Sequence, residues 1–186
     1  MTTANIITLV RIAMIPVFLV FAAQGNHPIV AAAIFAVASL TDSLDGYIAR
    51  KYNQITDFGK LIDPLADKLL VMSALLIFVA HGIMPVWAAT IVIGREFAIT
   101  SLRMVAAAKG IVIAAAKSGK AKTFVQCIMI ILVLVLGNNI IELTSWLTVQ
   151  DIAIYLMTFV SLYSCVDYFI ANGKVLKGSM AKQDSK

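Results

Sequence analysis

Apolar residues fill this chain in six long runs that short polar breaks separate. The runs cover about residues 5–24, 28–49, 60–80, 85–108, 119–137 and 147–170. Each run approaches the roughly 20 apolar residues that an α-helix needs to cross a bilayer. The breaks at 24–28, 81–85 and 137–139 contain the Gly, Pro and Asn residues that form turns. The pattern therefore predicts an all-α integral membrane protein with six transmembrane helices.

The composition agrees with a membrane protein. Hydrophobic residues make up 61% of the 186 residues, more than a soluble surface could absorb. Because no basic residue precedes Arg11, we expect the first run to be a span rather than a cleaved leader. The length suits one domain, so we expect a six-helix membrane domain over 1–172 and a basic cytoplasmic tail over 173–186.

The basic residues lie on one side of the predicted membrane. The breaks at 24–28, 81–85 and 138–147 contain no Lys or Arg, whereas the opposite loops contain Arg50 and many lysines. Because cytoplasmic loops of membrane proteins are the basic ones, both termini should be cytoplasmic. The net charge of +5 then fits anionic headgroups. We expect membrane lipids, and no nucleic acid, as partners.

Acidic residues concentrate where the second run meets the third. Five of the ten acidic residues lie between positions 42 and 67. Four of them form the pattern Asp42-x-x-Asp45-Gly46-x-x-Ala49-Arg50, then eight residues, then Gly59-x-x-x-Asp63-x-x-x-Asp67. A charge at bilayer depth costs on the order of 2.5–3.5 kcal/mol. Bound cations together with a polyanionic ligand would compensate these carboxylates.

The spacing of the carboxylates suits a metal site. Residues three or four apart share a helix face, so two neighbouring helices can direct Asp42, Asp45, Asp63 and Asp67 at one point. Such oxygen ligands suit Mg²⁺ or Mn²⁺, and two ions are the usual number for clamping a diphosphate. The alternative is a set of solvated carboxylates at a helix end, balanced by basic neighbours; it gives no reason for the spacing.

Small and basic residues inside the pattern also suit a phosphorylated ligand. Gly46 leaves room for a bulky ligand to approach the backbone. Arg50, one turn later, can direct its forked guanidinium at phosphate oxygens. Thr56 is a plausible cap for the helix that follows.

This pattern resembles the signature of the CDP-alcohol phosphotransferase family at every fixed position. The resemblance implies transfer of a phosphatidyl or similar group from a CDP-linked donor to an alcohol, with release of CMP. It implies that Asp42, Asp45, Asp63 and Asp67 hold the divalent ions, and that Asp67 is the general base that takes the acceptor's proton.

The same resemblance identifies donor-binding positions. Gly46, Arg50 and Thr56 match such positions in the signature. Asn5 and Thr8 do so in a segment, 5–11, that is similar to the family's N-terminal element P-N-x-x-T-x-x-R. Ala4 replaces the proline of that element.

A second stretch resembles one subgroup, the bacterial phosphatidylglycerophosphate synthases. The matching segments are Arg95-Glu96-Phe97, Arg103, 112–115 and Gly119-Lys120-x-Lys122-Thr123-x-x-Gln126. The likeness implies CDP-diacylglycerol as the donor, sn-glycerol 3-phosphate as the acceptor, the bacterial plasma membrane as the location, and an active site on its cytoplasmic side. It also implies a homodimer.

A phosphorylated acceptor needs a cationic pocket. Arg103 and Lys120 are the first candidates for this pocket, and Lys122 and Arg95 are the second choice. Positive-inside topology alone would also explain the lysines. For Arg95 and Glu96 we expect a mutual or interhelical pairing, since both lie within a predicted span.

Three other functions stay open from the residues alone. A sister enzyme would use another acceptor, such as inositol phosphate or phosphatidylglycerol. A small cation transporter would also carry intramembrane carboxylates, but near the midplane and in two related halves. A non-catalytic membrane scaffold would have no use for the aspartate spacing.

Overall fold

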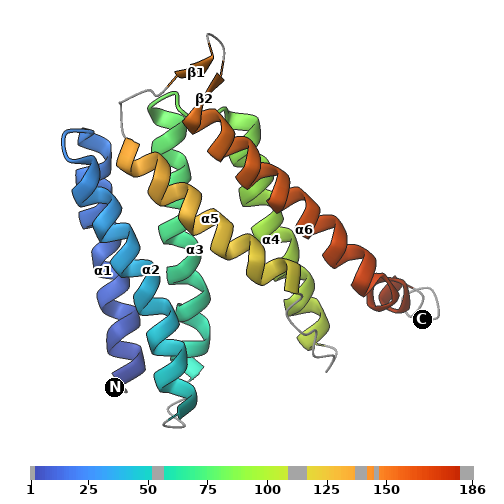
Figure 1. Ribbon diagram of the computed structural model, residues 1–186. Helices are drawn as coiled ribbons and strands as arrows, with labels where there is room; N and C mark the ends of the chain where they lie inside the picture. Colours follow the sequence, from blue (N-terminus) through green and yellow to red (C-terminus); the bar gives the residue numbers. More distant parts are fainter. Residues whose placement is uncertain (1–2, 52–56, 109–116, 137–141, 145–146, 181–186) are drawn as a thin grey trace. The chain divides into compact units, whose positions relative to one another are not determined.

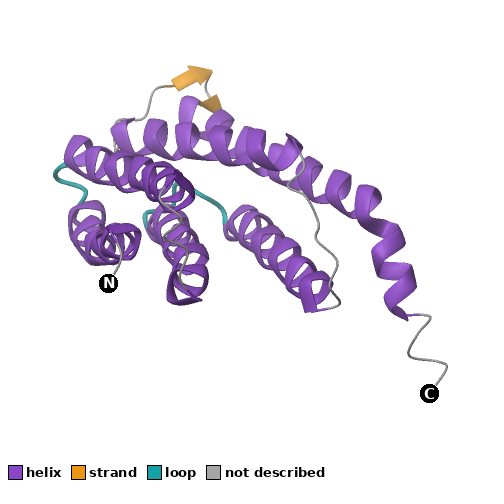
Figure 2. Ribbon diagram, turned by 90° about the horizontal axis from the view of Figure 1, so that it is seen from below, coloured by secondary structure: helices purple, strands orange, loops and turns teal. Residues whose placement is uncertain are grey.

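The computed structural model describes residues 3–51, 57–108, 117–136, 142–144 and 147–180. These ranges form six helices and two short strands, which Figures 1 and 2 show. The helices are α1 (Thr3–Gln24), α2 (Pro28–Lys51), α3 (Asp57–Ala80), α4 (Val86–Ala108), α5 (Lys117–Leu136) and α6 (Val149–Met180). The strands β1 (Glu142–Thr144) and β2 (Leu147–Thr148) pair antiparallel.

The six helices lie where the apolar runs predict them. Three segments, Ile6–Gln24, Ser118–Leu136 and Val149–Asn172, are long and apolar enough to cross a membrane by length and composition, in the part of the chain that the structure describes. The helical class is thus confirmed, apart from one small hairpin. β1 lies inside the break predicted at 138–147, whereas β2 takes the first two residues of the sixth predicted run, 147–170. α6 also continues to Met180, beyond the predicted end of the sixth span.

The turn after α3 shows why that helix ends where it does. Gly82 has a φ of 72°, a left-handed conformation that glycine adopts without steric cost. Its N–H donates to Val79 O (3.0 Å), and the Ile83 N–H donates to Phe78 O (2.9 Å). These two bonds form a Schellman motif, which satisfies carbonyls at the helix end. The predicted break at 81–85 is therefore a specific helix stop.

The start of α6 is fixed by a capping box. The Asp151 N–H donates to Thr148 Oγ1 (3.1 Å), and Asp151 Oδ2 accepts from the Thr148 N–H (3.0 Å). The two residues thus satisfy each other's backbone donors at the end of a helix that would otherwise leave them unpaired.

The chain divides into two compact units. Unit 1 comprises Met1–Pro85 and Cys127–Ile154, and unit 2 comprises Val86–Gln126 and Tyr155–Lys186. α5 and α6 each contribute one part to unit 1 and another to unit 2.

In unit 1, α1 packs against both α2 and α3, and α2 also touches α3 (Figure 1). The rings of Phe18 and Phe35 are fully buried, with centroids 5.8 Å apart. Ala31, Ala38 and Ala74 are also buried. Small residues at helix contacts let membrane helices approach closely.

In unit 2, Tyr168 of α6 packs with Ile99 and Leu102 of α4. Large apolar side chains elsewhere in the protein face outward, among them Phe159 (68% exposed) and Ile170 (77% exposed). Exposed apolar surface on this scale is unfavourable in water and suits contact with lipid. The protein is therefore a membrane protein.

Candidate functional site

The signature lies at adjoining ends of two helices in unit 1. Asp42, Asp45, Gly46 and Arg50 belong to the C-terminal part of α2, and Asp63 and Asp67 to the N-terminal half of α3. The end of α2 and the start of α3 lie at the same end of unit 1 (Figure 1). The backbone thus puts both carboxylate pairs on neighbouring helices, as their spacing predicts.

Most side chains of the signature lie outside the described part of the structure. These are the side chains of Asp42, Asp45, Arg50 and Asp63; the surroundings of Gly46 are also outside it, and Thr56 is wholly outside it. Asp67 is described and is half-buried, between buried Ala66 and a buried residue one turn later, Leu70. No cluster of three metal-binding side chains occurs among the described residues. Of the four predicted ligands, only Asp67 has a described side chain. Convergence of the four carboxylates stays a prediction.

The N-terminal element contributes two buried polar residues to unit 1. Thr8 is 2% exposed and Arg11 is completely buried, both on α1, whereas the Asn5 side chain lies outside the described part. A buried guanidinium is stable only with anionic or hydrogen-bonding partners. α1, which carries both residues, packs against the two helices that carry the signature. Arg11 is also the last fixed position of the N-terminal element, which is the signal for it in the sequence.

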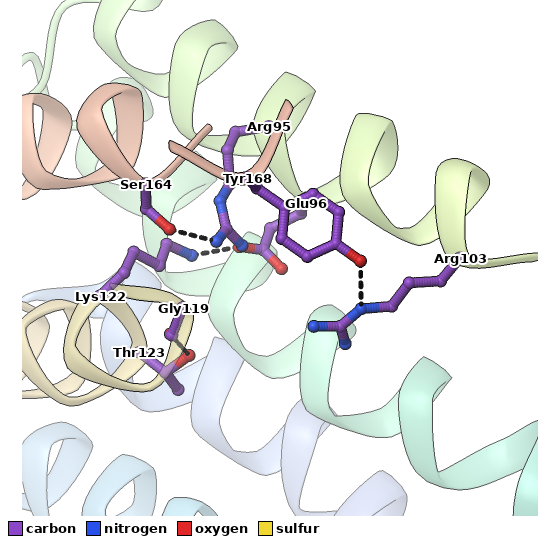
Figure 3. A network of polar contacts seen from close by, with 8 residues as sticks. All are labelled: Arg95, Glu96, Arg103, Gly119, Lys122, Thr123, Ser164 and Tyr168. Atoms are coloured by element: carbon purple, nitrogen blue, oxygen red, sulfur yellow. Dashed lines mark hydrogen bonds and ion pairs between the residues drawn. The ribbon is translucent and has the colours of Figure 1, made fainter. Parts of the chain in front are cut away.

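Unit 2 contains a buried ionic cluster, drawn in Figure 3 and called here the Glu96 cluster. It consists of Arg95, Glu96, Lys122 and Ser164. Glu96 Oε1 pairs with Arg95 Nη1 at 2.9 Å and with Lys122 Nζ. Arg95 Nη2 donates to Ser164 Oγ at 2.6 Å. The predicted pairing of Arg95 with Glu96 is confirmed, and the cluster ties α4 to α5 and α6.

The Glu96 cluster carries more positive than negative charge. Two cations share one carboxylate, and the side chains of Arg95 and Lys122 are only 8% and 3% exposed. Arg95 Nε and Gln126 Nε2 are buried donors for which the described residues supply no acceptor. A buried site with surplus positive charge and unused donors suits an anionic ligand.

Two further contacts join helices of unit 2. Arg103 Nε donates to Tyr168 Oη at 3.1 Å, and Ser118 Oγ donates to Asp167 Oδ2 at 2.5 Å. Each contact joins α6 to another helix, the first to α4 and the second to α5.

The two lysines of the Lys120-x-Lys122 segment differ in their surroundings. Lys122 is buried, 2% exposed, whereas Lys120 is exposed. Residues two apart on a helix lie about 200° around its axis, so they point to different sides. Of the two lysines, Lys122, a second-choice candidate for the acceptor pocket, is the one that joins the Glu96 cluster. The first-choice candidates for that pocket, Arg103 and Lys120, are both exposed.

Sequence reasoning missed Ser164 and Tyr168. The signal was a stripe of polar residues three or four apart in the sixth apolar run, at 158, 161, 164, 168 and 172. Such spacing places them on one helix face, and the first four are buried. A stripe of this kind in an apolar helix indicates the face that contacts other helices.

Gly119 of α5 lies beside Arg95 of the Glu96 cluster. A Cβ atom at Gly119 would lie 3.7 Å from Arg95 Nη2, an ordinary contact, whereas a Cβ at Gly94 would meet nothing within 4 Å. We expect Gly119→Ala to change the free energy of unfolding by less than about 1 kcal/mol. We expect Gly119→Leu to displace Arg95 and lower the thermal unfolding temperature in detergent. Gly94→Leu is the matched control; an equal loss there would contradict the explanation.

These features define a helical membrane protein with a carboxylate signature in unit 1 and the Glu96 cluster in unit 2. The chain belongs to the CDP-alcohol phosphatidyltransferase family, whose model matches residues 1–167. It is 42% identical to the CDP-diacylglycerol–glycerol-3-phosphate 3-phosphatidyltransferase of Bacillus subtilis, over 94% of this chain and 97% of the relative. The corresponding enzyme of Rickettsia bellii is 36% identical over 90% of this chain and 93% of the relative. A probable phosphatidylglycerophosphate synthase of Mycobacterium tuberculosis H37Rv is 46% identical over 68% of this chain and 63% of the relative.

Proposed function

We propose that this protein transfers a phosphatidyl group from CDP-diacylglycerol to sn-glycerol 3-phosphate, giving phosphatidylglycerophosphate and CMP. The observation that carries the proposal is the similarity to the Bacillus subtilis transferase over almost the whole of both chains. The complete signature on α2 and α3 supports the same chemistry. So do the exposed cations of unit 2, Arg103 and Lys120, which suit a phosphorylated acceptor.

In the proposed reaction, a hydroxyl oxygen of glycerol 3-phosphate attacks the phosphorus that carries diacylglycerol. The new P–O bond forms as the bond from that phosphorus to the diphosphate bridging oxygen breaks, and CMP leaves with the bonding electrons. Asp67 accepts the proton of the attacking hydroxyl. Its half-buried position on α3 is compatible with reach to both water and lipid.

Members of this family generally use divalent metal ions, and the donor set here suits them. Asp42, Asp45, Asp63 and Asp67 offer hard oxygen ligands from two helices that touch each other. We infer that they hold two ions, Mg²⁺ or Mn²⁺. When bound, such ions neutralise the diphosphate and so make CMP a better leaving group.

Removal of the metal should therefore stop the reaction. We expect EDTA in excess over divalent ions to abolish CMP release from purified protein, and added Mg²⁺ or Mn²⁺ to restore it. Ca²⁺ at equal concentration is the comparison ion, since it prefers more ligands at longer distances. Full turnover after exhaustive chelation would contradict the assignment of the carboxylates.

Binding of the two substrates divides between the motifs. We assign the CDP moiety of the donor to Asn5, Thr8, Gly46, Arg50 and Thr56. We assign the acceptor phosphate to Arg103 and Lys120, whose exposed side chains a soluble ligand can reach. Arg95 and Lys122 are the second choice for this role, because both are already paired with Glu96.

We further propose that all six helices cross the bacterial plasma membrane, with both termini and the active site on its cytoplasmic side. The asymmetric distribution of Lys and Arg supports this orientation. The acceptor and CMP would then exchange with the cytosol while the lipid tails stay in the bilayer. Family resemblance supports a homodimer.

An acceptor panel tests the proposed function. Purified protein with CDP-diacylglycerol and Mg²⁺ should release CMP with glycerol 3-phosphate, and much less with inositol phosphate or phosphatidylglycerol. CMP release with inositol phosphate alone would reassign the acceptor. Metal uptake into proteoliposomes without any CMP release would instead favour a cation transporter.

A further inference from the structure

Arg103 of α4 contacts Tyr168 of α6 in two ways. Arg103 Nε donates to Tyr168 Oη at 3.1 Å, and the guanidinium carbon lies 5.4 Å from the centroid of the tyrosine ring. The guanidinium is thus held through both its Nε–H and its charge, by a hydrogen bond and a cation–π contact.

The tyrosine is itself held in place. Tyr168 is 1% exposed and packs with Ile99 and Leu102, which lie on α4 as Arg103 does. A buried ring with close neighbours keeps one rotamer, so its hydroxyl is a fixed point. Arg103, by contrast, is exposed and has a long side chain with up to about 2 kcal/mol of rotamer freedom to lose.

The contact with Tyr168 leaves the two terminal guanidinium nitrogens of Arg103 available for a ligand. It occupies Nε, and Figure 3 shows the two terminal nitrogens directed away from the tyrosine. Two parallel N–H groups at the end of a guanidinium match two oxygens of a phosphate. Fixing the guanidinium beforehand reduces the entropy that an anion must overcome on binding.

We propose that Tyr168 is a positioning residue, which holds Arg103 ready for the phosphate group of the acceptor. This inference rests on the proposed function, since it takes glycerol 3-phosphate as the acceptor. Tyr168 need not touch the substrate, because its effect passes through the Nε of Arg103.

The test is Tyr168→Phe, which removes the hydroxyl and keeps the buried ring. We expect the KM for glycerol 3-phosphate to rise about fivefold, as for the loss of one net hydrogen bond. The KM for CDP-diacylglycerol and kcat should stay within about twofold. Tyr163→Phe is the matched control, because Tyr163 lies on the same helix but is 62% exposed. It should leave all three parameters unchanged.

A double-mutant cycle separates positioning from a general structural effect. Arg103→Lys keeps the charge but removes Nε and the fork, so Tyr168→Phe should add little to its KM for glycerol 3-phosphate. An equal rise in KM in both backgrounds, or an unchanged KM in the single variant, would overturn the inference. A loss confined to thermal stability would do so too. If wild-type protein releases no CMP with glycerol 3-phosphate, the proposed function itself fails, which distinguishes the two failures.

Discussion

Replacing Asp67 with asparagine should lower the rate of CMP release by at least about a hundredfold, because a positioned general base typically contributes that much or more. Asparagine has nearly the same shape but accepts no proton, and it also removes a negative charge from the proposed metal site. The measurement is CMP release at saturating CDP-diacylglycerol and glycerol 3-phosphate. Thermal unfolding in detergent should show that the variant still folds.

Asp151→Asn provides the control for this experiment. Asp151 also lies on a helix of the same protein, but its carboxylate serves the cap of α6 through Thr148. An asparagine oxygen can still accept from the Thr148 N–H, so turnover should remain close to that of the wild type. Wild-type turnover of Asp67→Asn would show that Asp67 is not the general base.

Replacing Glu96 with leucine should cost about 3–5 kcal/mol of stability, because breaking a buried ion pair leaves charge uncompensated. Arg95 and Lys122 would both lose their shared carboxylate while they remain buried. The expected result is a large fall in the thermal unfolding temperature in detergent. Glu96→Gln should cost less, since its amide oxygen still accepts hydrogen bonds.

Two further variants show whether the cost comes from the buried charge. Glu96→Leu combined with Lys122→Met should recover part of the loss, because replacing both partners with apolar residues is often nearly neutral. Thr123→Val alters an exposed residue next to Lys122 on α5. It should change stability by no more than about 0.5 kcal/mol. If the double variant is as unstable as Glu96→Leu alone, charge compensation by Glu96 is not the cause.

The helices were predictable because a long apolar segment has few choices of backbone structure in a membrane. Without water as a partner, each apolar segment must satisfy its own N–H and C=O groups, which an α-helix does. Apolar length and turn residues therefore located α1 to α6 closely. The strands β1 and β2 were not predicted, because they are only three and two residues long and lie where the fifth and sixth runs join.

The carboxylate signature of unit 1 and the cationic side chains of unit 2 differ in how far the sequence could describe them. The carboxylate signature spans only positions 42–67, so its spacing and family are readable along the chain. The cationic side chains of unit 2 make contacts with residues far away in the sequence, as Arg95 does with Ser164 and Arg103 with Tyr168. Charge alone ranked Lys120 before Lys122, and only the packed helices show that Lys122 joins Glu96.

By itself, the sequence determined the number and place of the helices, the family, and the residues proposed to hold metal. Each of these depends on composition or spacing within a short stretch. The tertiary structure decided which polar side chains meet, as at the Glu96 cluster and the contact of Arg103 with Tyr168. The reason is that a helix apolar on all sides can face lipid or protein equally well. Its rotation about its own axis is therefore set by packing and by the few polar contacts across helices.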